Sequence, residues 1–139
     1  MSQRYQLSFR SRVHYEEHEP GIPLRIALHA GGEDFECLAC IDTGAAACLF
    51  QREVGETLGL DIEAGMPARF STLTGLLQAF GHEVTMQVAG LTYQTTVYFA
   101  EFHGLPRNLL GKFGWLQQIR FGLVDYDEVI YLSDYNDPA

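Results

Sequence analysis

The clearest pattern in the chain is an alternation of apolar and polar residues between positions 23 and 41. Its apolar members are Leu24, Ile26, Leu28, Phe35, Cys37, Ala39 and Ile41. The segment Gly31-Gly32-Glu33-Asp34 interrupts the alternation with residues that favour a tight turn. Because successive side chains of a strand point to opposite faces of a sheet, the pattern predicts a β-hairpin whose second strand leads into Asp42.

Similar alternation predicts further hairpins along the rest of the chain. We expect one hairpin over residues 68–80 with its tip at Gly75, and another over 84–99 that turns at Ala89-Gly90. A closing pair of strands is predicted within residues 121–132.

Helical patterns are few and short. Gln51–Leu58 predicts one helix, and a second pattern places Phe113, Leu116 and Ile119 on one face. Alternation between residues 5 and 9 indicates an N-terminal edge strand. Many short strands, glycine-rich turns and one or two short helices are typical of an all-β barrel or sandwich.

Length and charge narrow the range of functions. A chain of 139 residues fits one domain with its own core. A net charge of −9 opposes binding to nucleic acid or to an anionic membrane surface, since both favour a basic face. No apolar run approaches the roughly 18 residues of a membrane span, and residues 1–10 do not resemble a secretory signal. We therefore expect a cytoplasmic protein.

The cysteines and histidines do not form a convincing metal or redox pattern. Cys37 and Cys40 have the spacing of a redox or metal motif, but an odd separation in a strand points them to opposite faces. Three cysteines also argue against a disulfide framework, so we expect buried structural thiols. The five histidines are scattered. No metal and no cofactor are predicted.

The candidate chemistry lies in Asp42-Thr43-Gly44-Ala45, directly after an apolar strand. A carboxylate is costly to bury there unless its charge is shared or hydrogen-bonded. The threonine hydroxyl can stabilise the turn, and Gly44 allows a close approach of backbone or substrate. An ordinary turn would use the same residue types, so the motif needs support from elsewhere in the chain.

That support comes from the order of three features. The Asp-Thr-Gly-Ala segment is followed by a hairpin at Thr74-Gly75, and then by an apolar strand that runs into Leu109-Leu110-Gly111. Over roughly residues 22–132, this arrangement resembles the retropepsin-like aspartic proteases, the homodimeric proteases of retroviral type and their bacterial relatives. The resemblance implies a closed β-barrel with a flap hairpin, in a symmetric homodimer. It would make residues 22–135 the protease domain and 1–21 an N-terminal segment.

The chemistry of such an enzyme agrees with the residue content. Two carboxylates can hydrolyse a peptide bond when one takes a proton from water and the other polarises the carbonyl. Two such groups about 3 Å apart share one proton. The chain contains one Asp-Thr-Gly, so the second Asp42 would come from another copy of the chain.

The resemblance also implies roles for individual residues. Asp42 would be the catalytic carboxylate, and Thr43 would bond across the dimer axis. Gly44 would allow the substrate backbone to approach. Ala45 lacks a hydroxyl that would stabilise the charged carboxylate, so we expect a less acidic pH optimum than in relatives with serine there. Gly111 would pack closely behind the Asp42 loop.

The same comparison assigns a substrate-binding surface. The flap and substrate-binding residues would be Leu73, Thr74, Gly75, Leu76 and Leu49. An extended peptide would lie between the flap and the floor of the site and bond along its backbone like an added strand.

The chain departs from the retroviral pattern at Ala46 and Ala47, where those proteases tend to carry acidic residues, so Lys112 has no obvious acidic partner. Two other functions fit the same sequence. One is a retropepsin-like module that dimerises or binds peptides without cleaving them. The other is a monomeric ligand-binding barrel in which Asp42 caps a turn.

Overall fold

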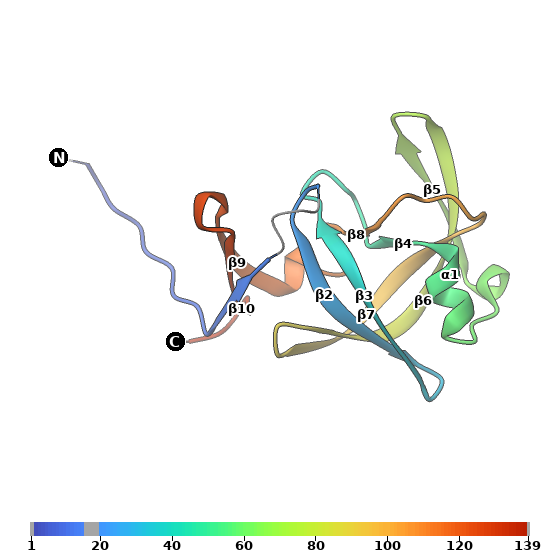
Figure 1. Cartoon of the computed structure of the whole chain (residues 1–139), viewed down its shortest axis with the longest axis horizontal. Helices are drawn as coiled ribbons and strands as arrows, with labels where there is room; N and C mark the ends of the chain where they lie inside the picture. The colour runs from blue at the N-terminus through green and yellow to red at the C-terminus, as the bar shows by residue number, and fades with distance from the viewer. Residues whose placement is uncertain (1, 16–19, 139) are drawn as a thin grey trace.

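The computed structural model describes residues 2–15 and 20–138 (Figure 1). The predicted N-terminal segment 1–21 therefore lies partly outside the described residues. The strands are β1 (Ser11–His14), β2 (Pro23–Ala30), β3 (Glu33–Ile41), β4 (Leu49–Phe50), β5 (Met66–Thr72), β6 (Gly75–Val88), β7 (Leu91–Ala100), β8 (Asn108–Leu110), β9 (Ile119–Val124) and β10 (Val129–Asp134). The helical elements are α1 (Arg52–Thr57) and the single 3-10 turns η1 (Ile62–Ala64), η2 (Leu116–Gln118) and η3 (Asp125–Asp127).

Six of the strands close into a barrel. They belong to a seven-stranded sheet with the order β2-β3-β8-β4-β7-β6-β5. An additional antiparallel pairing of β2 with β6, from Ile26 opposite Val88 to His29 opposite Thr85, joins the ends of the ring. This closure confirms the predicted β-barrel. Strand β5 stays outside the ring and pairs with the first half of β6, from Met66 opposite Gly81 to Thr72 opposite Gly75.

The barrel is closed because the alternating residues of its strands face one interior. Leu24, Ile26 and Leu28 of β2 are each no more than 2% exposed. Phe50 of β4 and Phe99 of β7 meet edge to face, with ring centroids 6.3 Å apart. Each such side chain contributes about 1.5–3 kcal/mol when it leaves water, so the period-two pattern predicts the hairpins well.

A second sheet, with the order β1-β10-β9, lies at the end of the molecule that carries both termini (Figure 1). The closing pair predicted within residues 121–132 is therefore confirmed as β9 and β10. Trp115 is fully buried, and its ring lies 6.4 Å from that of Phe121. Ile130 and Leu132 belong to the same continuous core as the barrel residues.

The predicted edge strand between residues 5 and 9 is wrong. Tyr5 and Leu7 are 83% and 66% exposed, and the strand begins only at Ser11. There Ser11–His14 pairs with Val129–Leu132 of β10. Alternation alone cannot decide this, because the partner strand is more than a hundred residues away in the sequence.

The two predicted helices differ in outcome. Helix α1 forms at Arg52–Thr57, as expected. The helix predicted from Phe113, Leu116 and Ile119 is wrong: only one 3-10 turn forms, and Ile119 begins β9. The N–H of Leu116 bonds to the carbonyl of Gly111, five residues back, so the segment does not follow a regular helical ladder.

Within the part of the chain that the structure describes, no helix has both the length and the apolar character needed to cross a bilayer.

Candidate active site

Asp42 lies at one end of the barrel, directly after β3 and beside the end of β8. Strand β3 runs parallel to β8, with Ile41 opposite Leu110, and the Asp42 N–H extends this pairing by donating to the Leu110 carbonyl at 3.0 Å. The carboxylate is half-buried. Its Oδ1 accepts a hydrogen bond from the Gly44 N–H at 2.9 Å, and the Ala45 N–H donates to the Asp42 carbonyl at 3.1 Å. The turn therefore fixes the carboxylate through backbone groups.

Gly111 closes this arrangement from behind. A Cβ atom at this position would lie 2.2 Å from the Ala47 carbonyl oxygen and 2.8 Å from that of Ala45, which no larger residue could tolerate without a backbone shift. The next two residues also bond to the loop. The Lys112 N–H donates to the Ala45 carbonyl and the Phe113 N–H to the Ala46 carbonyl, both at 2.9 Å. The structure thus brings Gly111 against the Asp42 loop.

Thr43 differs from Asp42 because its side chain takes no part in the hydrogen bonds of the loop. It is exposed, and its hydroxyl makes no hydrogen bond to any other residue in the described part of the chain. The side chain is therefore accessible to a group from outside the subunit.

The hairpin of β5 and β6 projects from the barrel (Figure 1). Its tip consists of Leu73 and Thr74, because Thr72 and Gly75 already face each other as the last pair of the ladder. The prediction of a tip at Gly75 is therefore wrong by one residue. The Thr72 hydroxyl donates to the Gly75 carbonyl at 2.7 Å and accepts from the Thr74 N–H at 3.3 Å. These bonds hold the tight turn together.

The predicted substrate-binding residues fall into two groups. Leu73 is fully exposed and Leu76 is 70% exposed, so both present apolar surface on the hairpin. Leu49 is only 6% exposed and lies in β4 opposite Leu109. Its neighbours on either side along the chain belong to the core cluster. The Leu49 side chain therefore points to the other face of the sheet, away from the barrel interior.

A hollow of about 330 Å³ opens beside Asp42. Its lining residues are Gly21, Cys40, Ile41, Asp42, Leu105, Pro106, Arg107 and Leu109. A neighbouring hollow of about 470 Å³ shares Cys40, Pro106 and Arg107 with it. Neither a motif nor a periodic pattern in the sequence marks residues 105–107 as part of a site.

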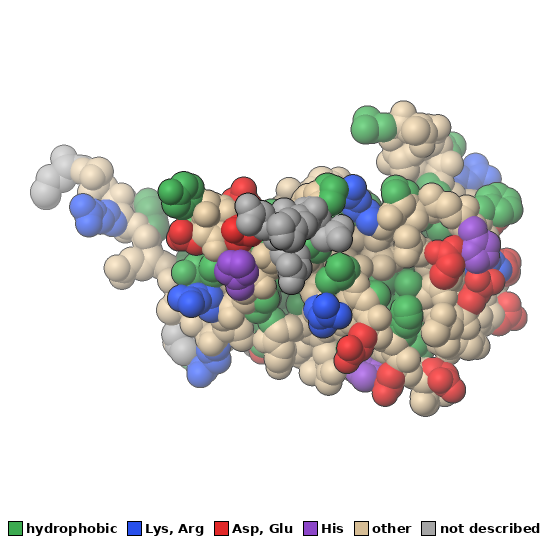
Figure 2. Space-filling view, in the orientation of Figure 1, with side chains coloured by type: hydrophobic (Ala, Val, Ile, Leu, Met, Phe, Trp, Pro, Cys, Tyr) green, Lys and Arg blue, Asp and Glu red, His purple; other side chains and the backbone are tan. Residues whose placement is uncertain are grey.

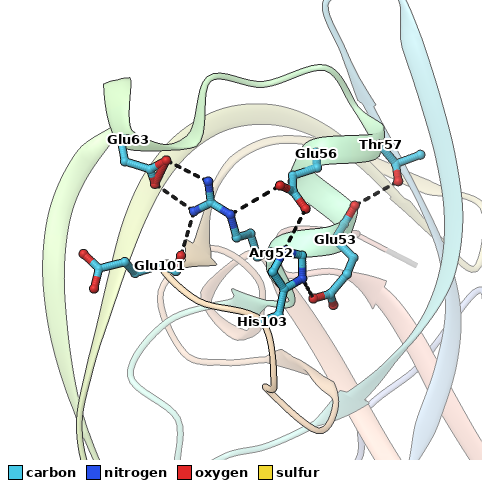
Figure 3. Close-up of polar contacts among 7 residues, drawn as sticks. All are labelled: Arg52, Glu53, Glu56, Thr57, Glu63, Glu101 and His103. Atoms are coloured by element: carbon cyan, nitrogen blue, oxygen red, sulfur yellow. Dashed lines mark hydrogen bonds and ion pairs between the residues drawn. The ribbon is translucent and has the colours of Figure 1, made fainter.

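A cluster of ion pairs holds the start of this loop on helix α1 (Figure 3). Arg52 donates to both carboxylate oxygens of Glu63 and to the Glu101 carbonyl, each at 2.7 Å. The guanidinium lowers the pKa of the Glu63 carboxyl below its ordinary value. His103 contacts Glu53 and Glu56 of the same helix. The cluster therefore connects α1, η1 and the loop.

The end of the loop is held by amide side chains. Gln51 donates through Nε2 to the Leu105 carbonyl at 2.8 Å, and its own N–H donates to Asn108 Oδ1 at 2.8 Å. Asn108 is 5% exposed and donates to the Leu38 carbonyl of β3 at 3.0 Å. Arg107 is thus carried by a segment anchored on both sides.

The cysteines follow the predicted division between faces. Cys37 packs against the core, and burial raises the pKa of its thiol to about 11. Cys40 lines both hollows, and Cys37 lines the larger one. Both residues are half-buried, so the expectation of buried thiols is confirmed only for Cys48. Among the described residues, no group of three His, Cys, Asp or Glu side chains has a geometry that could hold a metal ion.

Comparisons with known proteins agree with this geometry. The family model described as aspartyl protease matches residues 26–112, which include the Asp42 loop, the β5–β6 hairpin and Gly111. The chain therefore belongs to the aspartyl protease family. Its structure is similar to the crystal structure of a retropepsin-like aspartic protease from Rickettsia conorii, with a TM-score of 0.62 and 15% sequence identity. That match covers 92% of this chain and 100% of the other, and it confirms the retropepsin-like fold. No curated protein matches the chain in sequence.

Proposed function

We propose that this protein is an aspartic endopeptidase that acts as a homodimer, with one Asp42 from each subunit. The observation that carries the proposal is the position of Asp42. Its carboxylate is half-buried at the accessible end of β3, is held by the Gly44 N–H and is backed by Gly111. One chain supplies a single such group, so a pair requires two copies around a twofold axis.

In the proposed reaction, the two carboxylates share one proton and a water molecule between them. The ionised Asp42 takes a proton from the water as its oxygen attacks the carbonyl carbon of the peptide bond. The protonated Asp42 donates to the carbonyl oxygen and stabilises the charge that develops there. Proton transfer to the amide nitrogen then allows the carbon–nitrogen bond to break, which releases an amine and a carboxylic acid.

Thr43 is proposed to join the two subunits. Its hydroxyl is exposed and makes no hydrogen bond to other described residues, so it is available to the partner's loop across the axis. We propose that residues 22–135 form the domain that carries the activity.

The hairpin of β5 and β6 is proposed to act as the flap. Leu73, Thr74 and Leu76 are at or beside its tip and are exposed, and Gly75 completes the turn. A peptide lying extended beneath the hairpin would bond along its backbone, while apolar side chains contact Leu76 and the wall near Leu49. Closure of the hairpin would exclude water from the reacting groups.

The test is cleavage of a mixed peptide library between pH 3 and pH 7 by the wild type and by Asp42→Asn. We expect the substitution to lower cleavage by at least about 10³-fold, since it removes the base and the shared proton. Asp61→Asn is the matched control, because Asp61 is an exposed loop aspartate whose side chain caps nothing. It should leave cleavage unchanged.

Light scattering on the same samples tests the dimer. A dimeric wild type that cleaves no peptide at any pH would favour the module that binds or dimerises without turnover. A monomer at every concentration would favour a ligand-binding barrel and would contradict the proposed mechanism.

A further inference from the structure

We propose that Arg107 selects substrates that carry an acidic side chain, Glu or Asp, within two residues of the cleaved bond. This inference rests on the proposed endopeptidase function. Arg107 and Asp42 line the same hollow of about 330 Å³, so a side chain next to the reacting peptide bond would enter a space bordered by a guanidinium. The volume is at the lower end of the range for ligand pockets, as expected for one side chain.

The guanidinium has donors available for a ligand. Arg107 is exposed, and its Nη1 donates to the Pro20 carbonyl at 3.3 Å. Within the described part of the chain, no carboxylate forms an ion pair with it. Arginine presents five N–H groups in a planar fork that fits a carboxylate, so the remaining donors can bind one with two parallel bonds.

The remaining lining of the hollow makes charge the selective feature. Leu105, Pro106, Leu109 and Ile41 supply largely apolar surface around Arg107. An apolar side chain would leave the remaining guanidinium donors without a protein acceptor, whereas a glutamate would fill the space and satisfy them. Shape alone would not distinguish glutamate from glutamine, so a difference between the two reports on the charge.

The position of Arg107 is defined before substrate arrives. Gln51 holds the carbonyl of Leu105, and Asn108 holds the carbonyl of Leu38. Farther back, Arg52 binds the Glu101 carbonyl, and His103 contacts helix α1 (Figure 3). An anchored loop loses little freedom on binding, so more of the interaction appears as affinity.

Symmetry increases the effect. In the proposed dimer the Asp42 pair shares one proton and carries one negative charge, while two Arg107 side chains contribute two positive charges. These four groups together give the site a net positive charge, in a chain whose overall charge is −9. On the face that Figure 2 shows, both acidic and basic side chains occur.

The test uses pairs of peptides that differ only by Glu or Gln at each of the two positions on either side of the cleaved bond. At pH 6 we expect the wild type to favour glutamate by roughly tenfold in kcat/KM, as for one charge-assisted contact that is partly open to solvent. Arg107→Gln should remove the preference. The preference of the wild type should also decline below about pH 4, where the glutamate becomes protonated.

Arg25→Gln is the matched control, because Arg25 is an exposed arginine of β2 that does not line the Asp42 hollow. It should keep the full preference. Equal cleavage of both peptides by the wild type, or a preference that survives in Arg107→Gln, would overturn the inference.

A binding measurement separates this inference from the proposed function. Fluorescence anisotropy with the same labelled peptides and the Asp42→Asn protein measures the Glu-to-Gln ratio of affinities without any cleavage. A wild type that cleaves nothing contradicts the endopeptidase, while a glutamate preference lost in the Asp42→Asn, Arg107→Gln protein still supports the role of Arg107. Equal or undetectable binding of both peptides overturns that role.

Discussion

The Asp42 loop and the β5–β6 hairpin differ in how they are held, although both are proposed to contact substrate. The loop bonds to the chain around Gly111 through the backbone of three of its residues, Asp42, Ala45 and Ala46. The outer part of the hairpin is held by its own ladder and by bonds within it, from Thr72 to Gly75 and from Arg69 to Gln78. Nearer the barrel, the Phe70 ring meets that of Tyr98 edge to face. Leu73 at its tip is fully exposed. The comparison supports the proposal of a rigid floor that positions the carboxylate and of a hairpin that moves as a lid.

Gly111→Ala, in the floor, is expected to have the largest effect on stability and cleavage. The new Cβ would lie 2.2 Å from the Ala47 carbonyl oxygen, so the backbone of the floor must move. We expect a loss of about 3 kcal/mol in the free energy of unfolding, at the upper end for overpacking, together with loss of cleavage. Urea unfolding and peptide cleavage measure the two effects.

Gly122→Ala is the control for that substitution. Its Cβ would lie 3.2 Å from the Phe9 ring and at ordinary contact distance, 4.0 Å, from the Tyr131 Cβ. The Phe9 ring is on the N-terminal segment and can give way. A stability loss as large as that of Gly111→Ala would show that close packing at Gly111 is not special.

Gly75→Ala tests the lid without disturbing the floor. Gly75 has φ +127°, which an L-residue adopts only with strain, although the space around it is open. The strain costs about 1–3 kcal/mol, and we expect it to open the hairpin rather than the barrel. Cleavage should fall about tenfold while the melting temperature changes little. Equal losses of barrel stability and activity would contradict the separation of lid and floor.

Leu73→Ser sharpens the comparison within the hairpin. Leu73 is fully exposed, so its loss should not affect stability, but burial against a substrate contributes about 1.5 kcal/mol and its removal should raise KM about tenfold. Met66→Ser is the control, because Met66 is 69% exposed at the base of the same hairpin. If both substitutions raise KM equally, the tip has no special role.

The smallest effect on stability is expected for the ion-pair cluster around Arg52, which anchors the loop of residues 101–108. Arg52 lowers the pKa of Glu63, so the ion pair stabilises the fold above the ordinary glutamate pKa of 4.5. This contribution is lost as the pH falls through the lowered pKa. Glu63→Gln should therefore reduce the melting temperature slightly at pH 7, and the difference from the wild type should diminish as the pH falls from 4.5 toward 3.

Melting curves of Glu36→Gln across the same pH range provide the control. Glu36 is exposed on β3 and forms no ion pair with another described residue. A Glu63→Gln difference that persists undiminished at pH 3, or that Glu36→Gln reproduces, would show that the ion pair does not anchor the loop measurably.

Local patterns predicted the parts of the fold that depend on neighbours in sequence. The β2–β3 and β6–β7 hairpins follow from alternating residues on either side of glycine turns. The two strands of each hairpin are adjacent in sequence, and each buries one face, so the pattern is visible in a short segment. The helix at residues 113–119 failed for the opposite reason. Its apolar spacing fits a helix, but Trp115 enters the core and Ile119 is drawn into β9 opposite Asp134.

The candidate site shows the same division. Asp42, Gly44 and Gly111 could be selected from the sequence because the order of the Asp-Thr-Gly-Ala segment, the hairpin and the Leu-Leu-Gly element resembles the retropepsin-like proteases. Each element alone also fits an ordinary turn or core segment. Arg107 could not be selected, because nothing in its local sequence relates it to Asp42. The two residues line one hollow only because β3 and β8 run side by side.

The sequence by itself determined the alternating strands and the Asp42 turn, and it led to the proposal that a second copy completes a carboxylate pair. These properties depend on short-range periodicity and on the number of acidic motifs. The tertiary structure alone decided which strand closes the barrel, where β1 pairs, where the hairpin turns and which charge lies beside Asp42. Those outcomes depend on contacts between residues far apart in the chain, whose free energy exists only once the core has formed.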